Sequence, residues 1–372
     1  MGNIFISEII HHFNLRIAHF NNIANNALNY VLALRQQGID AHLFFEEGSH
    51  SFSQPNWEIP GIEKAKWIHK IKRLSGPVWS LSIRVLQTVY EVSKFDVISA
   101  WDTGPAWVQW TKKPLLVHSA GGDLLAALRS ASFRERLLRK GYERACCLIY
   151  YMPHQEEFLD KLRIKRKIFS RLPINEKRYY PKEGSVKFKH LKKYGTLFFC
   201  PSRQDWKWKG SHILIKAYSE ALRYDREIHL AMVKWGTDLA KSLELCKRLN
   251  IEDKISWLPQ LNKQDLIDMY CSCDVVVDQF VVGSYGSASI EALMCGRPVV
   301  IKLKGYDRYY SEELPFVSVQ NQKGITDAII MLSQDRQKRR AIGTRSREWA
   351  VKYHSYKSVS TEYLNLILEH CH

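Results

Sequence analysis

The sequence lacks the features that mark disulfide-rich, zinc-binding and membrane-spanning proteins. Its eight cysteines form no Cys-x-x-Cys pair and follow no regular spacing, so we expect reduced thiols and no metal site. No apolar run reaches the roughly 18 to 20 residues that a membrane-spanning helix needs. The opening, MGNIFISEIIHHF, has no basic start followed by an apolar core and a small-residue cleavage site. These absences predict a cytoplasmic protein.

Acidic residues are the scarcer charge. The chain has 38 Asp and Glu against 55 Lys and Arg, which gives a formal net charge of +17. Such a surplus favours an anionic partner, which can be nucleic acid, an acidic membrane face or a phosphorylated small molecule. No Gly-x-Gly-x-x-Gly follows the first expected strand, which argues against a classical dinucleotide oxidoreductase.

The chain is long enough for two domains. Single cores rarely grow beyond about 250 to 300 residues, and this sequence has 372. From about residue 14 it alternates short β-rich runs with helical stretches, which is typical of βαβ units and parallel sheets. We therefore predict an α/β protein with two doubly wound Rossmann-like domains that face each other across a cleft. The first is expected at residues 1–178, the second at 179–350, and a C-terminal helix at 351–372 is expected to cross back onto the first.

The turn PSRQDWKWKG, between the strand TLFFC and a helix from residue 210, carries two cations, Arg203 and Lys209. Ligands of doubly wound sheets bind at the carboxyl ends of the strands. A guanidinium and an ammonium beside a helix N-terminus can hold the two phosphates of one diphosphate. The alternative is a solvated turn that is merely basic.

A second candidate segment is GSYGS, which follows the apolar strand ending in VVVDQF and opens a helix at residue 287. Its glycines, Gly283 and Gly286, allow the backbone to approach a ligand closely, and the amides of residues 285–287 can point at an anion. Glu291, one turn further along, can accept a hydrogen bond from a ribose. Its alternative role is that of an acid that favours the helix dipole.

Three segments together resemble the donor-binding half of a retaining glycosyltransferase of family 4, which has the GT-B fold. They are PSRQDWKWKGSHILIKAY, ISWLPQLNKQDLIDMYCSCDVVV and GSYGSASIEALMCGRPVVI, in this order and spacing. The match spans roughly residues 196–303, and it is the combination of motifs that is specific.

The resemblance implies a role for each matching residue. Arg203 and Lys209 would be the catalytic cation pair that binds the donor diphosphate and stabilises the leaving nucleoside diphosphate, so no metal or other cofactor is expected. Glu291 matches the second Glu of the family's Glu-x7-Glu motif, which holds the ribose. The remaining matches are to donor-binding residues: Pro259, Gln260 and Leu261, which frame the base, and Ser284, Tyr285, Gly286 and Ser287, which touch the diphosphate and the sugar.

Two departures from the family pattern affect these expectations. Gly283 stands where the first Glu of the motif should bind the donor sugar, so either Asp278 compensates or the donor sugar is unusual. The first domain also has NNIANNA where the family has a Gly-Gly turn after its first strand. The acceptor side is therefore less well defined by the sequence than the donor side.

In the first domain, PLLVHSAGGDLLAAL resembles the family's His-Gly-Ser/Thr-Asp segment. Gly121 and Asp123 fit as donor-binding residues. His118 lies two positions before Ala120, where a histidine is wanted, and is a candidate catalytic residue through its ring or its carbonyl. The alternative for His118 is a hydrogen-bonded core histidine. His154 is a weaker candidate.

Two basic, aromatic-interleaved stretches of the first domain, at residues 64–73 and 161–171, lie outside these motifs. Nucleic acid is not expected, because no nucleic-acid-binding motif accompanies them. Basic amphipathic segments also bind anionic lipid, so a peripheral position on the cytoplasmic membrane face is predicted. An ordinary solvated surface is the alternative.

The leading hypothesis is an enzyme that transfers a sugar from a nucleotide diphosphate sugar to a hydroxyl acceptor with retention of configuration. A lipid-linked or polysaccharide acceptor in cell-surface glycan synthesis is expected. A degenerate nucleotide-sugar-binding protein or partner subunit is the alternative that Gly283 favours, and a nucleotide-sugar epimerase is a further one. The donor sugar, the acceptor and the linkage do not follow from the sequence.

Overall fold

The computed structural model describes residues 15–48, 51–72 and 78–371. These residues divide into two compact units, one formed by the described residues up to Asn175 together with those from Ser355 on, and the other by Glu176–His354. The boundaries expected from the sequence are at residues 178 and 350. Each unit is an α/β domain with a parallel sheet, which confirms the predicted fold class.

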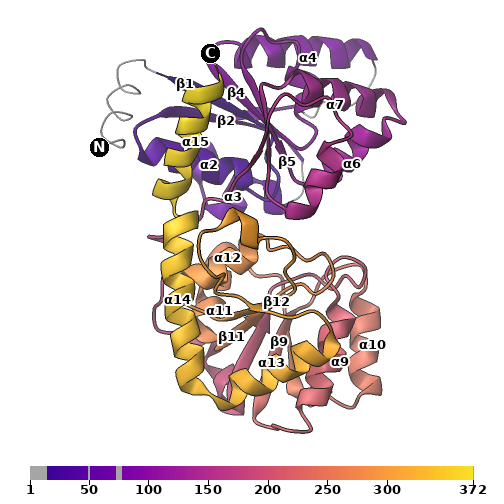
Figure 1. Cartoon of the computed structure of the whole chain (residues 1–372), viewed down its shortest axis with the longest axis vertical. Helices are drawn as coiled ribbons and strands as arrows, with labels where there is room; N and C mark the ends of the chain where they lie inside the picture. Colours follow the sequence, from indigo (N-terminus) through magenta and orange to yellow (C-terminus); the bar gives the residue numbers. More distant parts are fainter. Residues whose placement is uncertain (1–14, 49–50, 73–77, 372) are drawn as a thin grey trace. The chain divides into compact units, whose positions relative to one another are not determined.

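The first unit contains a parallel sheet of seven strands in the order β3-β2-β1-β4-β5-β6-β7 (Figure 1). The central strands β4, β5 and β6 are buried along their whole length, as expected for a sheet covered on both faces. The elements of this unit are β1 Arg16–Phe20, α2 Asn26–Gln36, β2 Asp40–Glu46, η1 Ser51–Ser53, α3 Pro55–Glu58, η2 Ile62–Lys64, β3 Ile68–Ile71, α4 Val78–Val92, β4 Val97–Trp101, α5 Pro105–Val108, β5 Leu115–Ser119, α6 Gly122–Arg129, α7 Phe133–Arg144, β6 Cys147–Tyr150, η3 Pro153–Gln155, α8 Glu156–Leu159, β7 Lys167–Phe169 and α15 Tyr356–His370.

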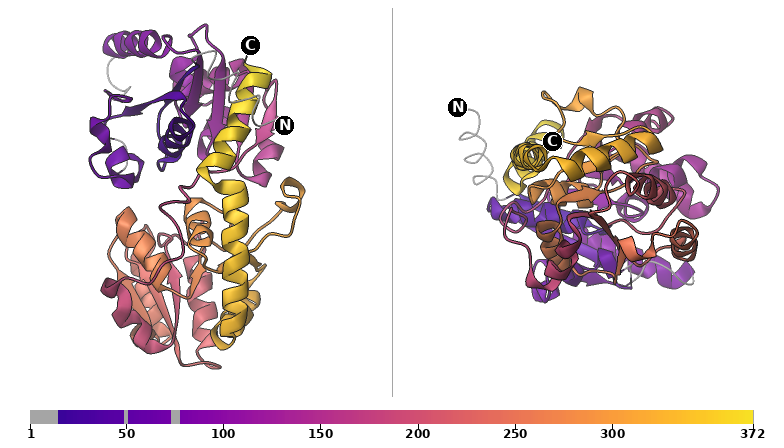
Figure 2. Two further views of the ribbon diagram at one scale, coloured as in Figure 1. Left: turned by 90° about the vertical axis from the view of Figure 1, so that its left-hand side faces the viewer. Right: turned by 90° about the horizontal axis from the view of Figure 1, so that it is seen from below.

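The C-terminal helix α15 completes the core of the first unit, as predicted. Its residues Val359 and Tyr363 belong to the same buried cluster as α2 and the strands. Tyr356 donates a hydrogen bond to Asn29 Oδ1 of α2 at 2.6 Å, and Glu362 pairs with Arg171. The left view in Figure 2 shows α15, the upper yellow helix, beside the strands of this unit.

The apolar periodicity of residues 123–142 predicts one continuous helix, but the structure has two. α6 ends at Arg129, its C-cap residue Ser130 adopts a left-handed φ of 50°, and α7 begins after Ser132. The Ser132 hydroxyl accepts from the Glu135 amide at 3.2 Å, and the Glu135 carboxylate accepts from the Ser132 amide at 3.0 Å. This reciprocal capping box starts a new helix where the apolar periodicity suggested continuity.

The second unit contains a parallel sheet in the order β10-β9-β8-β11-β12-β13. Helices α9, α10 and α13 share one buried cluster with the strands, whereas α12 packs against α14, so helices cover both faces (Figure 1). Its elements are η4 Val186–Tyr194, β8 Thr196–Cys200, α9 Ser211–Ala221, β9 Ile228–Val233, α10 Leu239–Arg248, η5 Glu252–Lys254, β10 Ile255–Leu258, α11 Lys263–Ser272, β11 Val275–Val277, α12 Ser287–Met294, β12 Val299–Ile301, η6 Asp307–Tyr309, β13 Val317–Ser318, α13 Gln322–Gln334 and α14 Arg336–His354.

Two general features of the sequence have structural counterparts. All eight cysteines are free thiols, and six of them are buried. Within the described residues, no helix combines the length and the apolar character needed to cross a bilayer.

Candidate active site

The strand order of the second sheet reverses between β8 and β11, because β8 pairs with β9 on one side and with β11 on the other. Ligands of doubly wound sheets bind outside the carboxyl ends of the strands at this point. The turn after β8 carries Arg203 and Lys209, and the segment after β11 begins with Asp278 and Gln279. The sheet topology therefore brings together two segments that are 70 residues apart at Lys209 and Gln279.

Arg203 is held by a carboxylate of its own turn. Its Nε and Nη2 atoms donate to Asp205 Oδ2 at 3.1 and 2.9 Å. Asp205 is buried and its other carboxylate oxygen accepts from the Trp208 amide at 2.9 Å, so the turn is rigidly bonded. The Arg203 side chain keeps 41% of its surface exposed, which leaves part of the guanidinium open to an anion.

Lys209 reaches across to the second segment. Its ammonium donates to Gln279 Oε1 at 2.9 Å, and its carbonyl accepts from the Phe280 amide at 2.9 Å. Because the Gln279 amide is neutral, this contact positions the ammonium without neutralising its charge. Gln279 did not figure in the sequence-based prediction, since only the sheet register shows that it faces the turn after β8.

Asp278, the residue suggested to compensate for Gly283, is buried and bonded to two serines. Ser202 Oγ donates to its Oδ1 at 2.5 Å, and Ser289 of α12 donates to its Oδ2. These bonds connect the end of β8 to the start of α12. Asp278 therefore links the turn after β8 to α12 through hydrogen bonds.

Gly283 occupies a conformation that favours glycine. Its φ is 78°, and an added Cβ would lie 3.3 Å from Lys304 Cβ. Its carbonyl accepts from the Lys304 amide at 3.0 Å. A glutamate here would be strained, since residues with a Cβ rarely adopt this region. The loop is therefore built around a glycine at the position where the resembled family has a carboxylate.

The segment 284–287 is anchored by the side chain of Tyr285. This ring is buried, stacks on Tyr306 at a centroid distance of 4.4 Å and bonds Tyr310 through its hydroxyl. The Ser284 carbonyl accepts from the Gln279 side chain. Gly286 precedes α12 with open space beside its Cα, and Ser287 is the first residue of α12. The aromatic anchor fixes the loop that presents the helix N-terminus.

Glu291 is buried in α12 and paired with a lysine that the sequence analysis did not identify. Lys263 Nζ donates to Glu291 Oε1, and the Tyr270 hydroxyl donates to Oε2 at 3.4 Å. The exposed fractions of the Lys263 and Glu291 side chains are 13% and 3%. Both partners belong to α11, so Glu291 joins α11 to α12.

The segment Pro259–Leu261 directly follows β10 at the edge of the second sheet. Pro259 and Gln260 are exposed, whereas Leu261 is buried. Two residues later, Lys263 opens α11, so this exposed edge leads directly to the partner of Glu291.

Residues 184–349 match the model of the family described as glycosyl transferases group 1. The second unit is a group 1 glycosyltransferase domain. An uncharacterized glycosyltransferase of Bacillus subtilis, YqgM, is 25% identical over 292 residues, which cover 73% of this chain and 77% of YqgM.

Solved structures resemble the whole chain in fold. HepE of Anabaena, crystallised with UDP and glucose, superposes with a TM-score of 0.75 at 17% identity and covers 95% of this chain and 100% of its own. Sucrose-phosphate synthase of Thermosynechococcus elongatus gives 0.68 at 18% identity, over 95% and 98% of the two chains. These likenesses show that the group 1 domain belongs to a chain with the GT-B fold.

His118, in the unit that precedes the group 1 domain, is a core residue in this structure. Its ring is fully buried and stacks on Trp101 at a centroid distance of 3.8 Å. Its nitrogens lie 2.5 Å from the Tyr151 hydroxyl and 3.4 Å from that of Tyr363 in α15. Burial lowers the pKa of His118 well below its usual value. This geometry fits the alternative of a satisfied core histidine. His154 is half-buried, and burial also lowers its pKa.

Gly121 and Asp123 lie at the turn between β5 and α6. Gly121 has a φ of 105°, and an added Cβ would lie 3.0 Å from Met152 Cε. Asp123 is buried and accepts from the Tyr142 hydroxyl at 2.5 Å and from the Ala120 amide at 3.3 Å. Burial raises the pKa of Asp123 to about 6. The carboxyl group is therefore bonded both to its own turn and to α7.

The NNIANNA loop after β1, at the position of the family's Gly-Gly turn, contains asparagines that adopt positive φ angles or hydrogen-bond through their side-chain amides. Asn21, Ala24 and Asn25 all adopt positive φ angles, of 71°, 48° and 57°. Asparagine tolerates this region better than most residues. The Asn22 side chain donates to Asn25 Oδ1 and to the Ser53 carbonyl, each at 2.7 Å. The loop is therefore stabilised by its own amides.

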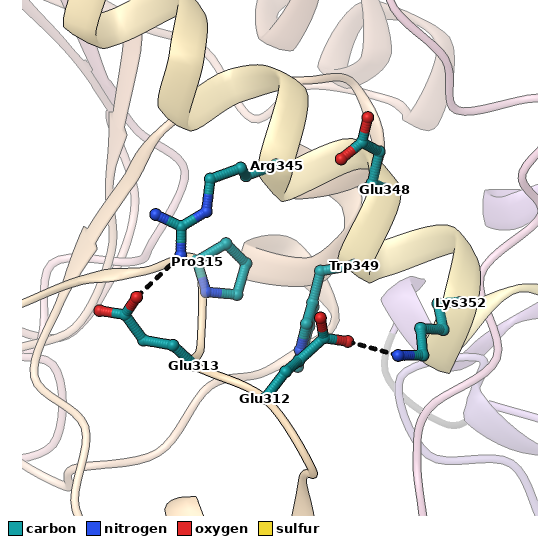
Figure 3. A pocket seen from close by; sticks show the side chains of 7 residues that line it. All are labelled: Glu312, Glu313, Pro315, Arg345, Glu348, Trp349 and Lys352. Carbon is teal, nitrogen blue, oxygen red and sulfur yellow. Dashed lines mark hydrogen bonds and ion pairs between the residues drawn. The ribbon is translucent and has the colours of Figure 1, made fainter.

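A surface pocket of about 300 Å³ in the group 1 domain contains none of the predicted site residues (Figure 3). Two ion pairs cross its mouth, Arg345 with Glu313 at 3.0 Å and Lys352 with Glu312 at 2.8 Å. Its inner wall is Trp349, which belongs to the aromatic cluster around Tyr310.

Among residues 15–48, 51–72 and 78–371, no group of three or more His, Cys, Asp or Glu side chains is placed to hold a metal ion.

Proposed function

We propose that this glycosyltransferase moves a hexose-type sugar from a nucleotide diphosphate sugar to a hydroxyl acceptor, with retention of configuration. The observation that carries the proposal is the placement of Arg203 and Lys209 at the strand-order reversal of the group 1 domain. HepE, which shares the fold, was crystallised with UDP and glucose, so a UDP-sugar is the first donor to test.

In this proposal, the two cations act mainly on the leaving group. The bond between the anomeric carbon and the diphosphate oxygen breaks, a bond to the acceptor oxygen forms on the same face, and the acceptor hydroxyl gives its proton to the departing diphosphate. Negative charge grows on the diphosphate during this step, and positioned cations stabilise it more strongly than they stabilise the bound donor. Arg203 and Lys209 then perform the task for which other transferases use a metal ion.

The test is a panel of UDP-, GDP- and ADP-sugars, assayed for binding and for release of the nucleoside diphosphate with and without EDTA. A ligand at about 100 times its dissociation constant stabilises the folded protein by roughly 2.7 kcal/mol, which a thermal-shift screen detects. We expect one donor to bind and to turn over equally well in EDTA. Binding of none of these donors would overturn the proposal, and loss of turnover in EDTA would remove its metal-free part.

The alternative, a nucleotide-sugar-binding protein without transferase activity, is favoured by Gly283 alone. The left-handed φ of this residue disfavours any side chain here, including the carboxylate that the resembled family uses. The same panel separates the two hypotheses, because a binding protein shifts the melting temperature without releasing nucleoside diphosphate from any sugar donor.

The two basic stretches lie at opposite edges of the first sheet. Residues 64–72 lead into and include β3, and residues 161–171 include β7, whereas Arg73 lies outside the described residues. Seven strands at a spacing of about 4.8 Å separate these edges by about 29 Å, so the stretches do not form one patch. Lysines on an edge strand also prevent unwanted sheet pairing, which explains part of this charge without a lipid.

We propose that the β3 edge, together with α4, contacts an anionic membrane and there meets a lipid-linked or polysaccharide acceptor of cell-surface glycan synthesis. Ile83, Leu86 and Tyr90 of α4 are 54%, 68% and 66% exposed, and their spacing places them on one face of the helix. The end of α4 lies near β3, because the Phe44 ring contacts both His69 of β3 and Phe95, three residues beyond α4, at centroid distances of 4.4 and 5.6 Å. An apolar stripe beside cations suits the headgroup region of a bilayer.

A further inference from the structure

We infer that Lys263 is a positioning residue in the binding of the donor nucleoside. It holds the Glu291 carboxylate in place to accept hydrogen bonds from the ribose. The inference rests on the proposed function, together with the ribose contact that the family resemblance implies for Glu291. Nothing in the sequence motifs points to Lys263, and its role follows from the packing of α11 against α12.

The pair is buried on both sides. Lys263 Nζ donates to Glu291 Oε1, and these side chains retain only 13% and 3% of their exposed surface. A buried carboxylate that loses its cation is left with an uncompensated charge, which is strongly unfavourable. The orientation of the Glu291 carboxylate therefore depends on Lys263.

The local sequence of α11 does not explain a lysine at this position. Lys263 is the first residue of the helix, after the cap residue Asn262, where the positive end of the helix dipole disfavours a cation. Its ammonium lies 6.0 Å from the centroid of the Tyr179 ring. The compensation for the unfavourable dipole comes from Glu291 in the neighbouring helix.

Lys263 also links Glu291 to the proposed edge for the base. Its Nζ donates to Glu291 Oε1, and the Tyr270 hydroxyl lies 3.4 Å from Oε2. Lys263 follows the segment Pro259–Leu261, in which Pro259 and Gln260 are exposed, by two residues. One ion pair thus connects the segment for the base with the acceptor for the ribose.

The test measures the preference for ribose over 2′-deoxyribose. Binding of UDP and 2′-deoxy-UDP is measured by calorimetry, with the GDP and ADP pairs in parallel, for the wild type, Glu291→Gln, Lys263→Met, Lys263→Gln and Lys263→Arg. The matched control is Lys182→Met, because Lys182 also pairs with an acid of α11, Asp268 at 2.8 Å, without contacting Glu291. Melting temperatures report whether each variant folds, and Lys263→Gln replaces Lys263→Met if the latter does not.

We expect the wild type to bind the ribonucleotide at least about tenfold more tightly, as a hydrogen bond to a charged acceptor implies. Lys263→Met or Lys263→Gln should lower this preference to about twofold by weakening ribonucleotide binding alone, since one charge-assisted contact is degraded. Lys263→Arg should restore most of the preference, and Lys182→Met should leave it unchanged.

The outcomes separate the inference from the function on which it rests. If Glu291→Gln removes the preference while both neutral Lys263 variants keep it, the role of Lys263 is overturned and the proposed function stands. If Glu291→Gln itself leaves the preference unchanged, the ribose contact of the proposed function is wrong. An equal loss in Lys182→Met would show a general effect of α11 stability and would also overturn the inference.

Discussion

Replacing Arg203 by alanine tests the catalytic centre most directly, because the structure separates its effect on turnover from its effect on stability. Among the contacts that the described residues show, the guanidinium bonds only to Asp205, at 3.1 and 2.9 Å. The Arg203 side chain is 41% exposed. A pair of this exposure contributes about 0 to 1 kcal/mol to stability.

The effect on turnover should be much larger. Removing one positioned donor to charge that develops in the transition state costs about 2.7 to 4 kcal/mol, which is a factor of about 10² to 10³ in kcat. A loss of at most about 1 kcal/mol in stability lowers the melting temperature by only about 2 to 4 °C for a unit of this size. Arg203→Ala should therefore be folded and nearly inactive.

The assay follows release of nucleoside diphosphate at saturating and at low donor concentrations, together with thermal unfolding. Arg203→Lys keeps a charge but loses the planar fork, so it should recover only part of the activity. Arg248→Ala, which removes an exposed arginine of α10, is the matched control and should change neither quantity. An Arg203→Ala enzyme with a kcat within about threefold of the wild type would refute the catalytic role, since that factor is under 1 kcal/mol.

Two further predictions concern the first unit. The hydrogen bond from Cys371 lowers the pKa of Cys146 to about 7, so alkylation of Cys146 by iodoacetamide, followed by mass spectrometry, should rise with a midpoint near pH 7. The midpoint should shift upward in Cys371→Ala, and an unchanged midpoint would contradict the assignment. Burial raises the pKa of the neighbouring Cys147 to about 12, so Cys147 should stay unmodified. Leu86→Glu should reduce salt-sensitive pelleting with anionic vesicles by about fivefold or more, since one charge near the surface changes the binding free energy by about 1 kcal/mol. Lys165→Gln at the β7 edge makes the same change in net charge and should leave pelleting unaltered. Equal binding to a nonspecific DNA duplex, or no pelleting at low salt, would argue against the membrane surface.

Much of the fold could be predicted because the strands are short, apolar on both faces and separated by helical patterns. β8, β9 and β11 lie where the apolar runs indicated them. β3 was missed, because its residues belong to a basic stretch that was interpreted as a surface. The break between α6 and α7 could have been predicted from the sequence, since Ser132 and Glu135 have the spacing of a capping box.

The site was predictable only where local sequence determines it. Arg203 and Lys209 belong to one turn whose neighbouring strand and helix are visible in the sequence. Gln279 and Lys263 were missed, because their contacts depend on which strand ends and helices become neighbours in the folded sheet. The motif around Tyr285 predicted a role for its backbone amide but not for its ring. The ring is buried against aromatic residues of later segments, such as Tyr306.

The position of α15 has a consequence for how the protein is made. The first unit is assembled from both ends of the chain, and residues such as Val359 and Tyr363 are part of its core, whereas the second unit is one continuous segment. Domains usually fold in the order of synthesis, at about 5 to 20 residues per second. Here all of the second unit is synthesised before α15, so the first unit cannot close its core until the whole second unit has been translated.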